Sequence, residues 1–493
     1  MLYHSTRSLN FTADSAAAVL QGLAPDGGLY MPAVLPPFDW EKCIKGTAQQ
    51  MSCIILSALL PDIPNMETLV KNAYTGKFET EELTPTVPVG DFHVLELFRG
   101  PTSAFKDVAL CMLPQLLTAA KKEKGQEKDI LILTATSGDT GKAALAGFRD
   151  VPGIKICVFY PQGGVSQVQR AQMVTQEGNN VKVCAVEGNF DDAQTGVKQI
   201  FSTCRNMELP FRLSSANSIN IGRLAPQITY YFKAYRDLVD RDEIIMGDEV
   251  NFSVPTGNFG DILAGYLAKQ LGLPVGKLIC ASNANKVLTD FIRTGTYDRR
   301  RVLLKTTSPS MDILVSSNLE RLLYLLTEDT DLVRGYMEQL NEEGFYTLGE
   351  DLLAKVQEQF WGDFCDDRDT ANTVYRVFRN HGYLCDTHTA AGWLAAEHYV
   401  NQSGDNRPMV VLSTASPYKF PQAVLEAIGE LPEGDEFALM EQLREVSSVP
   451  VPANLANLRE KPERHTGIID RDDMLAYVLG LCGCELPEEE ENQ

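Results

Sequence analysis

Short apolar runs alternate along the middle of the chain with longer segments in which apolar positions recur every three or four residues. The apolar runs at 92–98, 129–136, 154–160 and 181–186 have the length and composition of buried strands. The segments between them have the spacing of amphipathic helices. Buried strands that alternate with helices predict a parallel sheet with helices on both faces.

A second series of apolar runs lies further along the chain, at 250–255, 277–281 and 409–414. We therefore expect two α/β units, and helical spacing at 43–60 and 66–74 predicts a small, mostly helical N-terminal domain. The expected division is 1–90 for the N-terminal domain, 91–128 with 220–435 for a large domain that carries a helical insertion at about 285–380, 129–219 for a smaller mobile α/β domain, and 436–493 for a helical C-terminal extension.

Composition narrows the class of protein. The 493 residues are 44% hydrophobic and 22% charged, which is typical of a globular enzyme. The formal net charge of −22 argues against nucleic acid or an anionic membrane as a partner, because either would require a basic face. No run of eighteen apolar residues occurs and the first residues lack the pattern of a signal sequence, so we expect a cytoplasmic protein. The 11 cysteines are scattered, which predicts neither a disulfide framework nor a metal site.

Lys106 is the first candidate for chemistry. It follows a Gly-Pro turn at 100–101, Thr102 or Ser103 can cap the helix that follows, and Phe105 places a ring beside the amine. Most lysines are simply exposed, and that reading is the ordinary one for a single lysine. A lysine at a helix start and against an aromatic ring, however, is pushed toward its neutral, nucleophilic form, which suits a Schiff base.

A polar loop at 136–142 reads Thr-Ser-Gly-Asp-Thr-Gly-Lys and enters an expected helix at 143–148. Its backbone N–H groups and its hydroxyl and carboxylate side chains could bind an anion or another polar group. The spacing excludes a nucleotide P-loop, because Thr136 stands where the first glycine is required and Ala143 where the last hydroxyl is required. A capped helix with a tight turn is an equally good interpretation of this loop alone.

A second loop at 255–262 reads Pro-Thr-Gly-Asn-Phe-Gly-Asp-Ile. Gly257 and Gly260 flank Asn258 and allow the backbone to approach a tetrahedral anion at the start of a helix. The spacing is not that of a dinucleotide site. The loop is a weak signal alone, but pyridoxal 5′-phosphate requires one lysine for its aldehyde and one anion site for its phosphate, and Lys106 supplies the first.

A third polar group, at 413–421, follows the last strong strand. A hydroxyl from Ser413 or Thr414 could face the pyridine nitrogen of the cofactor. A neutral hydroxyl there makes the ring a milder electron acceptor than a carboxylate partner does, which favours elimination and replacement at β and γ carbons over transamination. Lys419 in this group is equally well explained as a surface charge.

The motifs taken together resemble threonine synthase, in the longer branch of that family with an extra N-terminal domain. The matching stretches are Thr-Ser-Ala-Phe-Lys-Asp at 102–107, Thr-Ala-Thr-Ser-Gly-Asp-Thr-Gly at 134–141, Asn-Ser-Ile-Asn at 217–220, Ser-Val-Pro-Thr-Gly-Asn-Phe-Gly at 253–260, Ser-Thr-Arg at 5–7 and Pro-Asp-Gly-Gly at 25–28. They occur in the right order over nearly the whole chain. The resemblance implies fold type II of the pyridoxal-phosphate enzymes, an α/β fold with two parallel-sheet domains.

The resemblance also implies roles for individual residues. The residues implied at the cofactor are Lys106 as the Schiff-base lysine, Gly257, Asn258, Phe259, Gly260 and Asp261 around the phosphate, and Thr414 at the ring nitrogen. The residues implied at the substrate are Ser137 and Thr140 for the carboxylate, Arg223, Lys419 and Asn217 as candidates for the phosphate, and also Asn220 and Asp139. Asp139 stands where many relatives carry an asparagine near the 3′ oxygen of the ring, and its role is left open.

The implied reaction converts O-phospho-L-homoserine and water to L-threonine and phosphate, a carbon–oxygen lyase reaction in which Lys106 moves the protons. The alternative is a phospholyase that releases 2-oxobutyrate, ammonia and phosphate. Such relatives often lose the aromatic residue of the phosphate loop, whereas Phe259 is present. A non-catalytic relative is disfavoured because Lys106 and both loops are retained. We expect a small-molecule substrate and a monomer or homodimer.

Overall fold

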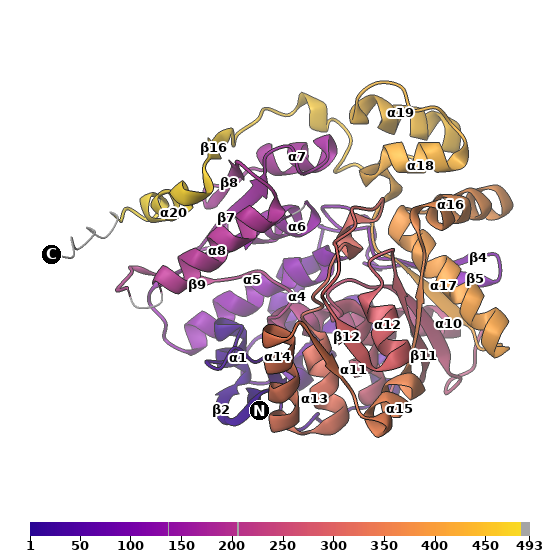
Figure 1. The fold of residues 1–493 in the computed structure, drawn as a ribbon, viewed down its shortest axis with the longest axis horizontal. Helices are drawn as coiled ribbons and strands as arrows, with labels where there is room; N and C mark the ends of the chain where they lie inside the picture. Colours follow the sequence, from indigo (N-terminus) through magenta and orange to yellow (C-terminus); the bar gives the residue numbers. More distant parts are fainter. Residues whose placement is uncertain (137, 205–206, 485–493) are drawn as a thin grey trace.

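The computed structural model describes residues 1–136, 138–204 and 207–484, and two sheets organise it (Figure 1). The larger sheet has six strands in the order β14-β11-β10-β15-β5-β4. Its strands are β4 (Thr86–Val89), β5 (Phe92–Glu96), β10 (Val250–Pro255), β11 (Val275–Ser282), β14 (Phe360–Phe364) and β15 (Met409–Ser413). Neighbouring strands are parallel except β4, which pairs antiparallel with β5 at one edge.

The larger sheet is covered on both faces, and β11 shows how. Leu278 and Cys280 belong to a core shared with α10 (Ile228–Asp240) and α11 (Gly260–Gln270). The alternate residues Ile279 and Ala281 belong to a separate core shared with α16 (Asp367–His381), α17 (Thr387–Ser403), α18 (Pro421–Ile428) and α19 (Glu436–Ser447). Successive strand side chains point to opposite faces, so a continuous apolar run marks a strand buried on both sides, as the sequence predicted.

The smaller sheet has five parallel strands in the order β16-β8-β7-β6-β9. They are β6 (Asp129–Ala135), β7 (Ile154–Pro161), β8 (Val181–Val186), β9 (Phe211–Ser214) and β16 (Gly467–Ile469), and the connecting helices are α6 (Asp139–Phe148), α7 (Gln167–Val174) and α8 (Phe190–Cys204). β16 comes from the C-terminal extension, which was expected to be helical. α20 (Met474–Leu481) then packs beside α8, as Figure 1 shows, so the extension completes this part of the fold.

The N-terminal segment contains a small sheet as well as the expected helices. Strands β1 (Leu2–Ser5), β2 (Ser8–Asp14) and β3 (Tyr30–Pro32) form an antiparallel sheet in the order β2-β1-β3. The helices are α1 (Ser15–Gln21), α2 (Trp40–Cys43), α3 (Ala48–Leu59) and α4 (Met66–Tyr74). Sequence periodicity predicted α3 and α4, but it missed the sheet because most of β2 is exposed and polar.

The insertion between β11 and α16 also contains strands in addition to helices. Its elements are α12 (Val287–Thr294), β12 (Thr296–Asp298), the short helix η2 (Pro309–Met311), α13 (Leu319–Thr327), α14 (Thr330–Glu342), β13 (Phe345–Thr347), α15 (Glu350–Gln359) and β14. β12 pairs with β13, and β14 forms the edge of the larger sheet. The expected helical insertion at 285–380 therefore also extends the main sheet.

The remaining helices place the chemistry-bearing loops. They are α5 (Lys106–Glu123), α9 (Ile221–Leu224) and the short helices η1 (Ala225–Gln227), η3 (Pro417–Lys419), η4 (Leu458–Glu460) and η5 (Arg471–Asp473). The loops of interest follow the carboxyl ends of β5, β6, β10 and β15, the edge of a parallel sheet where ligands bind. None of the helices in the described ranges is both long enough and apolar enough to cross a membrane.

Candidate active site

Lys106 is the first residue of α5, in a loop held against the end of β15. The backbone N–H of Phe105 donates to the Thr414 carbonyl at 2.8 Å, and Ala104 forms a β-bridge with Ala415. Thr102 or Ser103 was expected to cap the helix, but neither side chain does so, and the Thr102 side chain bonds elsewhere. The backbone N–H and the hydroxyl of Thr102 both donate to the carboxylate of Asp107, at 2.8 and 2.6 Å. The loop therefore fixes where the Lys106 side chain begins, beside the last strand of the larger sheet.

The Lys106 amine is nearly buried. Its side chain is 13% exposed, and Nζ lies 3.9 Å from Asp139 Oδ2 and 4.8 Å from the centre of the Phe105 ring. Burial lowers the pKa of this amine, the Asp139 carboxylate opposes the shift, and the charges of Lys419 and Arg223 add to it. A lowered pKa leaves more of the amine neutral at neutral pH, as a nucleophile or base requires.

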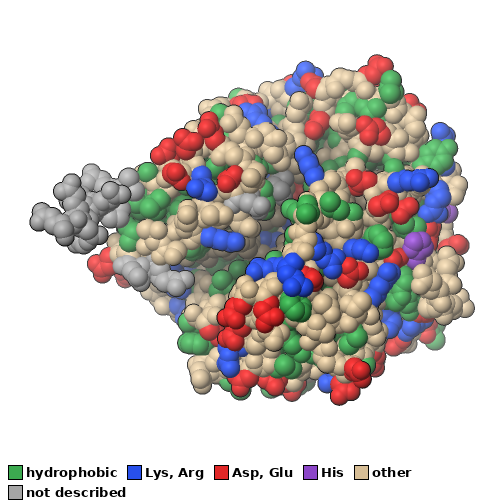
Figure 2. Space-filling model, in the orientation of Figure 1, with side chains coloured by type: hydrophobic (Ala, Val, Ile, Leu, Met, Phe, Trp, Pro, Cys, Tyr) green, Lys and Arg blue, Asp and Glu red, His purple; other side chains and the backbone are tan. Residues whose placement is uncertain are grey.

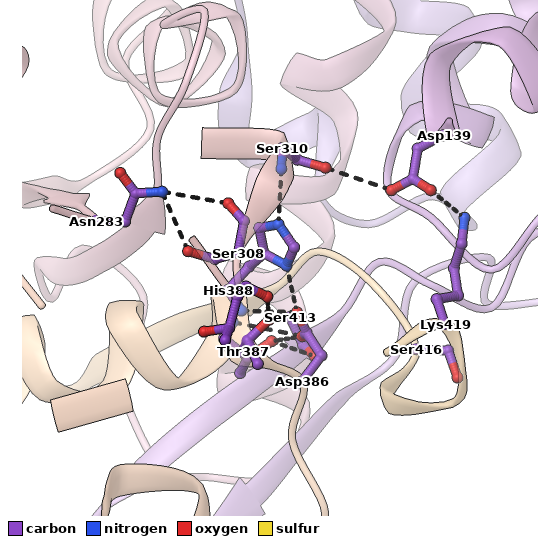
Figure 3. A network of polar contacts seen from close by, with 12 residues as sticks. Asp139, Asn283, Ser308, Ser310, Asp386, Thr387, His388, Ser413, Ser416 and Lys419 are labelled. Carbon is purple, nitrogen blue, oxygen red and sulfur yellow. Dashed lines mark hydrogen bonds and ion pairs between the residues drawn. The ribbon is translucent and has the colours of Figure 1, made fainter. Parts of the chain in front are cut away.

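Asp139 joins two lysines. Its Oδ1 lies 2.5 Å from Lys419 Nζ (Figure 3) and accepts from Gln169 Nε2 at 2.9 Å, while its Oδ2 lies 3.9 Å from Lys106 Nζ. Burial alone would raise the pKa of Asp139, but Lys419 and Lys106 outweigh it and hold that pKa well below its ordinary value. Lys419 is 0% exposed, which excludes the surface-charge reading of that residue.

The polar loop between β6 and α6 is organised by Thr136. Its hydroxyl oxygen accepts from the backbone N–H groups of Gly138 and Gly141, at 3.0 and 2.9 Å. Gly138 has a φ of 139°, and a Cβ there would lie 2.4 Å from the Gln169 side chain, so only glycine fits. Thr140 is partly exposed in the first turn of α6, and Ser137 lies outside the described residues.

The loop between β10 and α11 has the features of an anion site. Its carbonyls bond to the insertion: Ser316 Oγ donates to Gly257 O at 2.8 Å, and Asn318 donates through N and Nδ2 to Asn258 O at 3.1 Å each. Within the described part of the chain, no acceptor pairs with the backbone N–H groups of Gly257, Asn258, Phe259 and Gly260. Donors left over at a helix start fit a phosphate, so this loop fits that part of pyridoxal phosphate.

Two residues shape this loop further. Phe259 is 1% exposed with a left-handed φ of 62°, and its ring packs 5.5 Å from that of Phe360. Asp261 Oδ1 accepts from the hydroxyls of Tyr230 and Tyr231, while its buried Oδ2 has no partner among the described residues. Burial raises the pKa of Asp261 to about 7.

The hydroxyls at the end of β15 differ from each other. Ser413 Oγ lies 2.9 Å from Thr389 Oγ1 and so is engaged within the protein. The Thr414 side chain forms no hydrogen bond with any described residue. Thr414 is therefore the hydroxyl of this pair that is left for a cofactor.

The Asn-Ser-Ile-Asn segment corrects one expectation. Asn220 was expected to bind substrate, but its Nδ2 donates to Val19 O at 2.9 Å and its Oδ1 accepts from Gly222 N at 2.8 Å. Both ends of the amide are used to join α1 to α9, and the residue is 1% exposed. Asn220 is thus a structural cap. Asn217, by contrast, is exposed.

Arg223, on α9, is a buried guanidinium with unused donors. It is 3% exposed, one NH group donates to Ala216 O, and its Nε has no partner among the residues that the structure describes. Burial lowers its pKa to about 10. No carboxylate in the described ranges forms an ion pair with it. An unpaired buried cation close enough to shift the pKa of Lys106 provides an anion-binding group within this site.

The site also includes residues that sequence reasoning missed. Gln169 bonds to Asp139, Asn318 holds the phosphate loop, and Ser310 lies 3.4 Å from Asp139 through its Oγ. They come from α7 and from the insertion, and isolated polar residues in such segments carry no motif. Figure 2, in the orientation of Figure 1, shows a hollow in the surface between the part that carries α8 and the part that carries α14. Lys and Arg side chains gather on the rim of this hollow.

Three family models match successive parts of the chain. The model described as "Threonine synthase N terminus" matches residues 2–74, "Pyridoxal-phosphate dependent enzyme" matches 78–415, and "Threonine synthase, C-terminal" matches 389–477. The second model alone spans more than half of the chain and contains Lys106 and both loops.

Individual proteins and solved structures agree with these models. The chain is 38% identical to threonine synthase of Pseudomonas aeruginosa, over 94% of this chain and 95% of that protein. It is also 38% identical to human threonine synthase-like 1, of which it spans 57%. The crystal structure of pyridoxal-phosphate-bound threonine synthase from Brucella melitensis superposes with a TM-score of 0.86 at 37% identity, covering 98% of this chain and 99% of that one. The chain therefore belongs to the threonine synthase family, within the fold type II enzymes that depend on pyridoxal phosphate.

Proposed function

We propose that this protein converts O-phospho-L-homoserine and water to L-threonine and phosphate. The observation that carries the proposal is the grouping of three features in one site. They are the nearly buried amine of Lys106, the loop at 257–260 with its unused N–H donors, and the unpaired guanidinium of Arg223. A substrate that carries an amine and a phosphate requires the Lys106 amine and the Arg223 guanidinium. A phosphorylated cofactor requires the N–H donors of the loop.

The cofactor would be held at three places. We assign its aldehyde to Lys106, its phosphate to the N–H groups of the loop from Gly257 to Gly260, and its ring nitrogen to the Thr414 hydroxyl. Asp261, at the start of α11, supports the phosphate loop through its contacts with Tyr230 and Tyr231. When bound, pyridoxal 5′-phosphate supplies a ring that withdraws electrons from the substrate carbons.

The substrate phosphate would bind at Arg223 and Lys419. Arg223 is buried without an anionic partner, so a bound phosphate would supply the counter-charge that the fold omits. Lys419 Nζ contacts Asp139 Oδ1 and donates to Thr102 O at 3.3 Å, which leaves one of its three N–H donors for the phosphate. Asn217, Thr140 and Ser137 are the candidates for the remaining polar contacts and for the substrate carboxylate.

Lys106 would move the protons. Its amine has a lowered pKa, so it can take a proton from Cα and assist removal of one at Cβ at neutral pH. Asp139, 3.9 Å away, stabilises the ammonium form that results. A base that gains and returns a proton needs both effects, because a strong shift in one direction would trap it in one state.

The second candidate function is the phospholyase that releases 2-oxobutyrate. The comparisons do not favour it, because the threonine synthases of Pseudomonas aeruginosa and Saccharomyces cerevisiae match this chain over more than nine-tenths of both proteins. Phe259 argues for the synthase, because its buried ring and left-handed backbone conformation are built into the phosphate loop.

A product assay separates the two reactions. The purified protein is supplied with pyridoxal phosphate and O-phospho-L-homoserine, and phosphate, threonine, 2-oxobutyrate and ammonia are measured together. The proposal predicts one threonine for each phosphate. Equal amounts of 2-oxobutyrate and phosphate with little threonine would establish the phospholyase, and no phosphate release would exclude both. Lys106→Ala protein, carried through the same purification, is the blank.

The remaining expectations belong to the same proposal. The segment 129–219, which carries four strands of the smaller sheet, would move relative to the rest and close over the substrate. We further propose a cytoplasmic location and a monomer or homodimer. Because the chain's net charge of −22 repels an anion, local cations such as Arg223 and Lys419 would have to draw in the substrate phosphate.

A further inference from the structure

A buried Asp–His pair lies beside the site and has no part in the proposed reaction. His388 and Asp386, at the start of α17, are 2% and 0% exposed. His388 Nδ1 lies 2.8 Å from Asp386 Oδ1, and the other ring nitrogen, Nε2, accepts a hydrogen bond from the backbone N–H of Ser310 at 3.1 Å (Figure 3). The pair thus connects α17 to the short helix η2 of the insertion.

The backbone donor determines which nitrogen of the ring carries the proton. An amide N–H can only donate, so Nε2 must carry the lone pair and Nδ1 must carry the proton that Asp386 accepts. This arrangement differs from a hydrolytic Asp–His–Ser triad, in which the serine hydroxyl donates to the imidazole. Ser310 Oγ donates instead to Asp139 Oδ2 at 3.4 Å, so the imidazole has no nucleophile to activate.

The turn that His388 holds touches the two most important parts of the site. A Cβ on Gly257 would lie 2.7 Å from the Ser310 carbonyl oxygen, so the turn packs directly on the phosphate loop. Ser310 Oγ contacts Asp139, the partner of Lys106 and Lys419. A shift of Ser310 would therefore reach both the phosphate loop and the catalytic lysine's counter-ion.

The other side of the pair leads to the ring-nitrogen position. Asp386 Oδ2 accepts from the Thr389 hydroxyl, and Thr389 Oγ1 lies 2.9 Å from Ser413 Oγ. Ser413 immediately precedes Thr414. All of these groups are buried, and Asp386 accepts from two backbone N–H groups as well, at His388 and Thr389. One fully bonded carboxylate thus orients both the imidazole and the end of β15.

We propose that His388 is a positioning residue, which keeps the turn at 308–312 against the phosphate loop and Ser310 against Asp139. The inference rests on the proposed function in taking the Lys106 site to be the cofactor site. Other contacts also hold the turn, including Asn283 Nδ2 to Ser308 Oγ at 3.2 Å and to Asp312 Oδ1 at 2.8 Å. His388 differs from them because its bond is made at Ser310, the residue that touches both Gly257 and Asp139.

Hydrogen exchange and cofactor titration of the full-length protein test this role. His388→Leu removes the acceptor of the Ser310 N–H, and we expect backbone exchange at 308–312 to accelerate about tenfold, with about tenfold weaker pyridoxal phosphate binding. His388→Gln places an acceptor oxygen near the position of Nε2 and should restore both values to within about threefold of the unaltered protein. Ser310→Ala keeps the N–H and should leave the exchange unchanged while lowering kcat through the lost contact with Asp139.

The chain supplies a matched control on the same helix. His398 pairs with Asp363 through Nδ1 at 2.6 Å, but it is 43% exposed and makes no bond to the turn, so His398→Leu should change neither reading. The inference is overturned if His388→Leu leaves exchange at 308–312 unchanged, if it raises exchange uniformly across the protein, or if Ser310→Ala loosens the turn equally. Failure of the unaltered protein to bind the cofactor would count against the proposed function, and the exchange comparison would still decide on the His388 contact.

Discussion

Two buried arginines, Arg223 at the site and Arg321 at the junction with the N-terminal domain, have similar surroundings and different uses. They are 3% and 0% exposed, and burial lowers the pKa of each to about 10. Arg321 donates to Tyr30 O, to Ile219 O at 2.6 Å and to Asn318 Oδ1 at 2.6 Å. Arg223 has a protein partner at Ala216 O and an unpartnered Nε.

This difference in hydrogen bonding distinguishes a cation that stabilises the fold, Arg321, from one that is available to bind a ligand, Arg223. Arg321 satisfies carbonyl and amide oxygens from three segments, and Asn318, one of its partners, in turn holds the Asn258 carbonyl of the phosphate loop. Its charge is buried at a cost that its hydrogen bonds offset. The fold leaves the Nε donor of Arg223 without an acceptor among the described residues, as expected for a site whose anion arrives with the substrate.

The largest effect should come from Lys106, whose side chain, like that of Arg223, serves a ligand and not the fold. Lys106→Ala removes the amine that binds the cofactor and moves the protons, so turnover should be abolished. Stability should change little, because the amine is buried beside Asp139 without the bonds that Arg321 makes. Absorbance of the purified protein and a phosphate-release assay check this, and a yellow, active variant would contradict it.

Arg223→Met should weaken catalysis strongly and leave the fold intact. Removing one charged donor from a site of this kind typically costs roughly 10²- to 10³-fold in turnover. Replacing an unpaired buried cation with an apolar side chain of similar size is often neutral or stabilising. Steady-state kinetics beside urea unfolding measures both quantities. If the variant loses stability but keeps its turnover per folded molecule, Arg223 has a structural role like that of Arg321.

Arg321→Met should show the opposite pattern. It leaves three buried oxygens without their donor, which we expect to lower the free energy of unfolding by about 3–5 kcal/mol. Turnover per folded molecule should fall far less than in Arg223→Met. Equal loss of stability in the two arginine variants, measured by urea unfolding, would erase the distinction drawn between them.

The last effect concerns the stability contributed by Asp261, and it appears as pH dependence. Its pKa is about 7 in the folded protein and 3.8 in the absence of burial, so between these values the folded state holds a proton that the unfolded state has lost. The stability that this carboxyl contributes is therefore full below about pH 4 and is lost as the pH rises through about 7.

Asp261→Asn replaces the protonated carboxyl with an uncharged amide and should remove this dependence. The variant should gain about 4 kcal/mol over the unaltered protein between pH 4 and pH 8, as measured by urea unfolding at both pH values. Identical slopes of stability against pH for the two proteins would show that Asp261 does not carry the effect.

The sequence predicted the parts of the molecule that have periodicity or a local motif. Strands β8 and β10 have the predicted bounds, because uninterrupted apolar runs mark strands that are buried on both faces. Lys106 and the loop at 257–260 could be found because glycines and a lysine at strand ends carry local signals.

The parts that depend on distant segments could not be predicted. β16 is three residues long and exists because β8 offers an edge far away in the sequence. Asn220 lies in a motif that implied substrate binding, but its side chain donates to the carbonyl of Val19, about 200 positions earlier in the sequence. His388, Gln169 and Ser310 reach the site from separate helices, and nothing in their local sequence indicates which carboxylate they will meet.

The most direct test of the account is to identify the lysine that holds the cofactor. Pyridoxal phosphate bound to the protein is reduced with borohydride, and peptide mass spectrometry locates the modified residue. Two other lysines could compete with Lys106 for the aldehyde. Lys419 is fully buried next to Asp139, and burial lowers the pKa of Lys142 to about 7. The account predicts a single modified lysine, Lys106. Modification of Lys142 or Lys419 with Lys106 left free would contradict it.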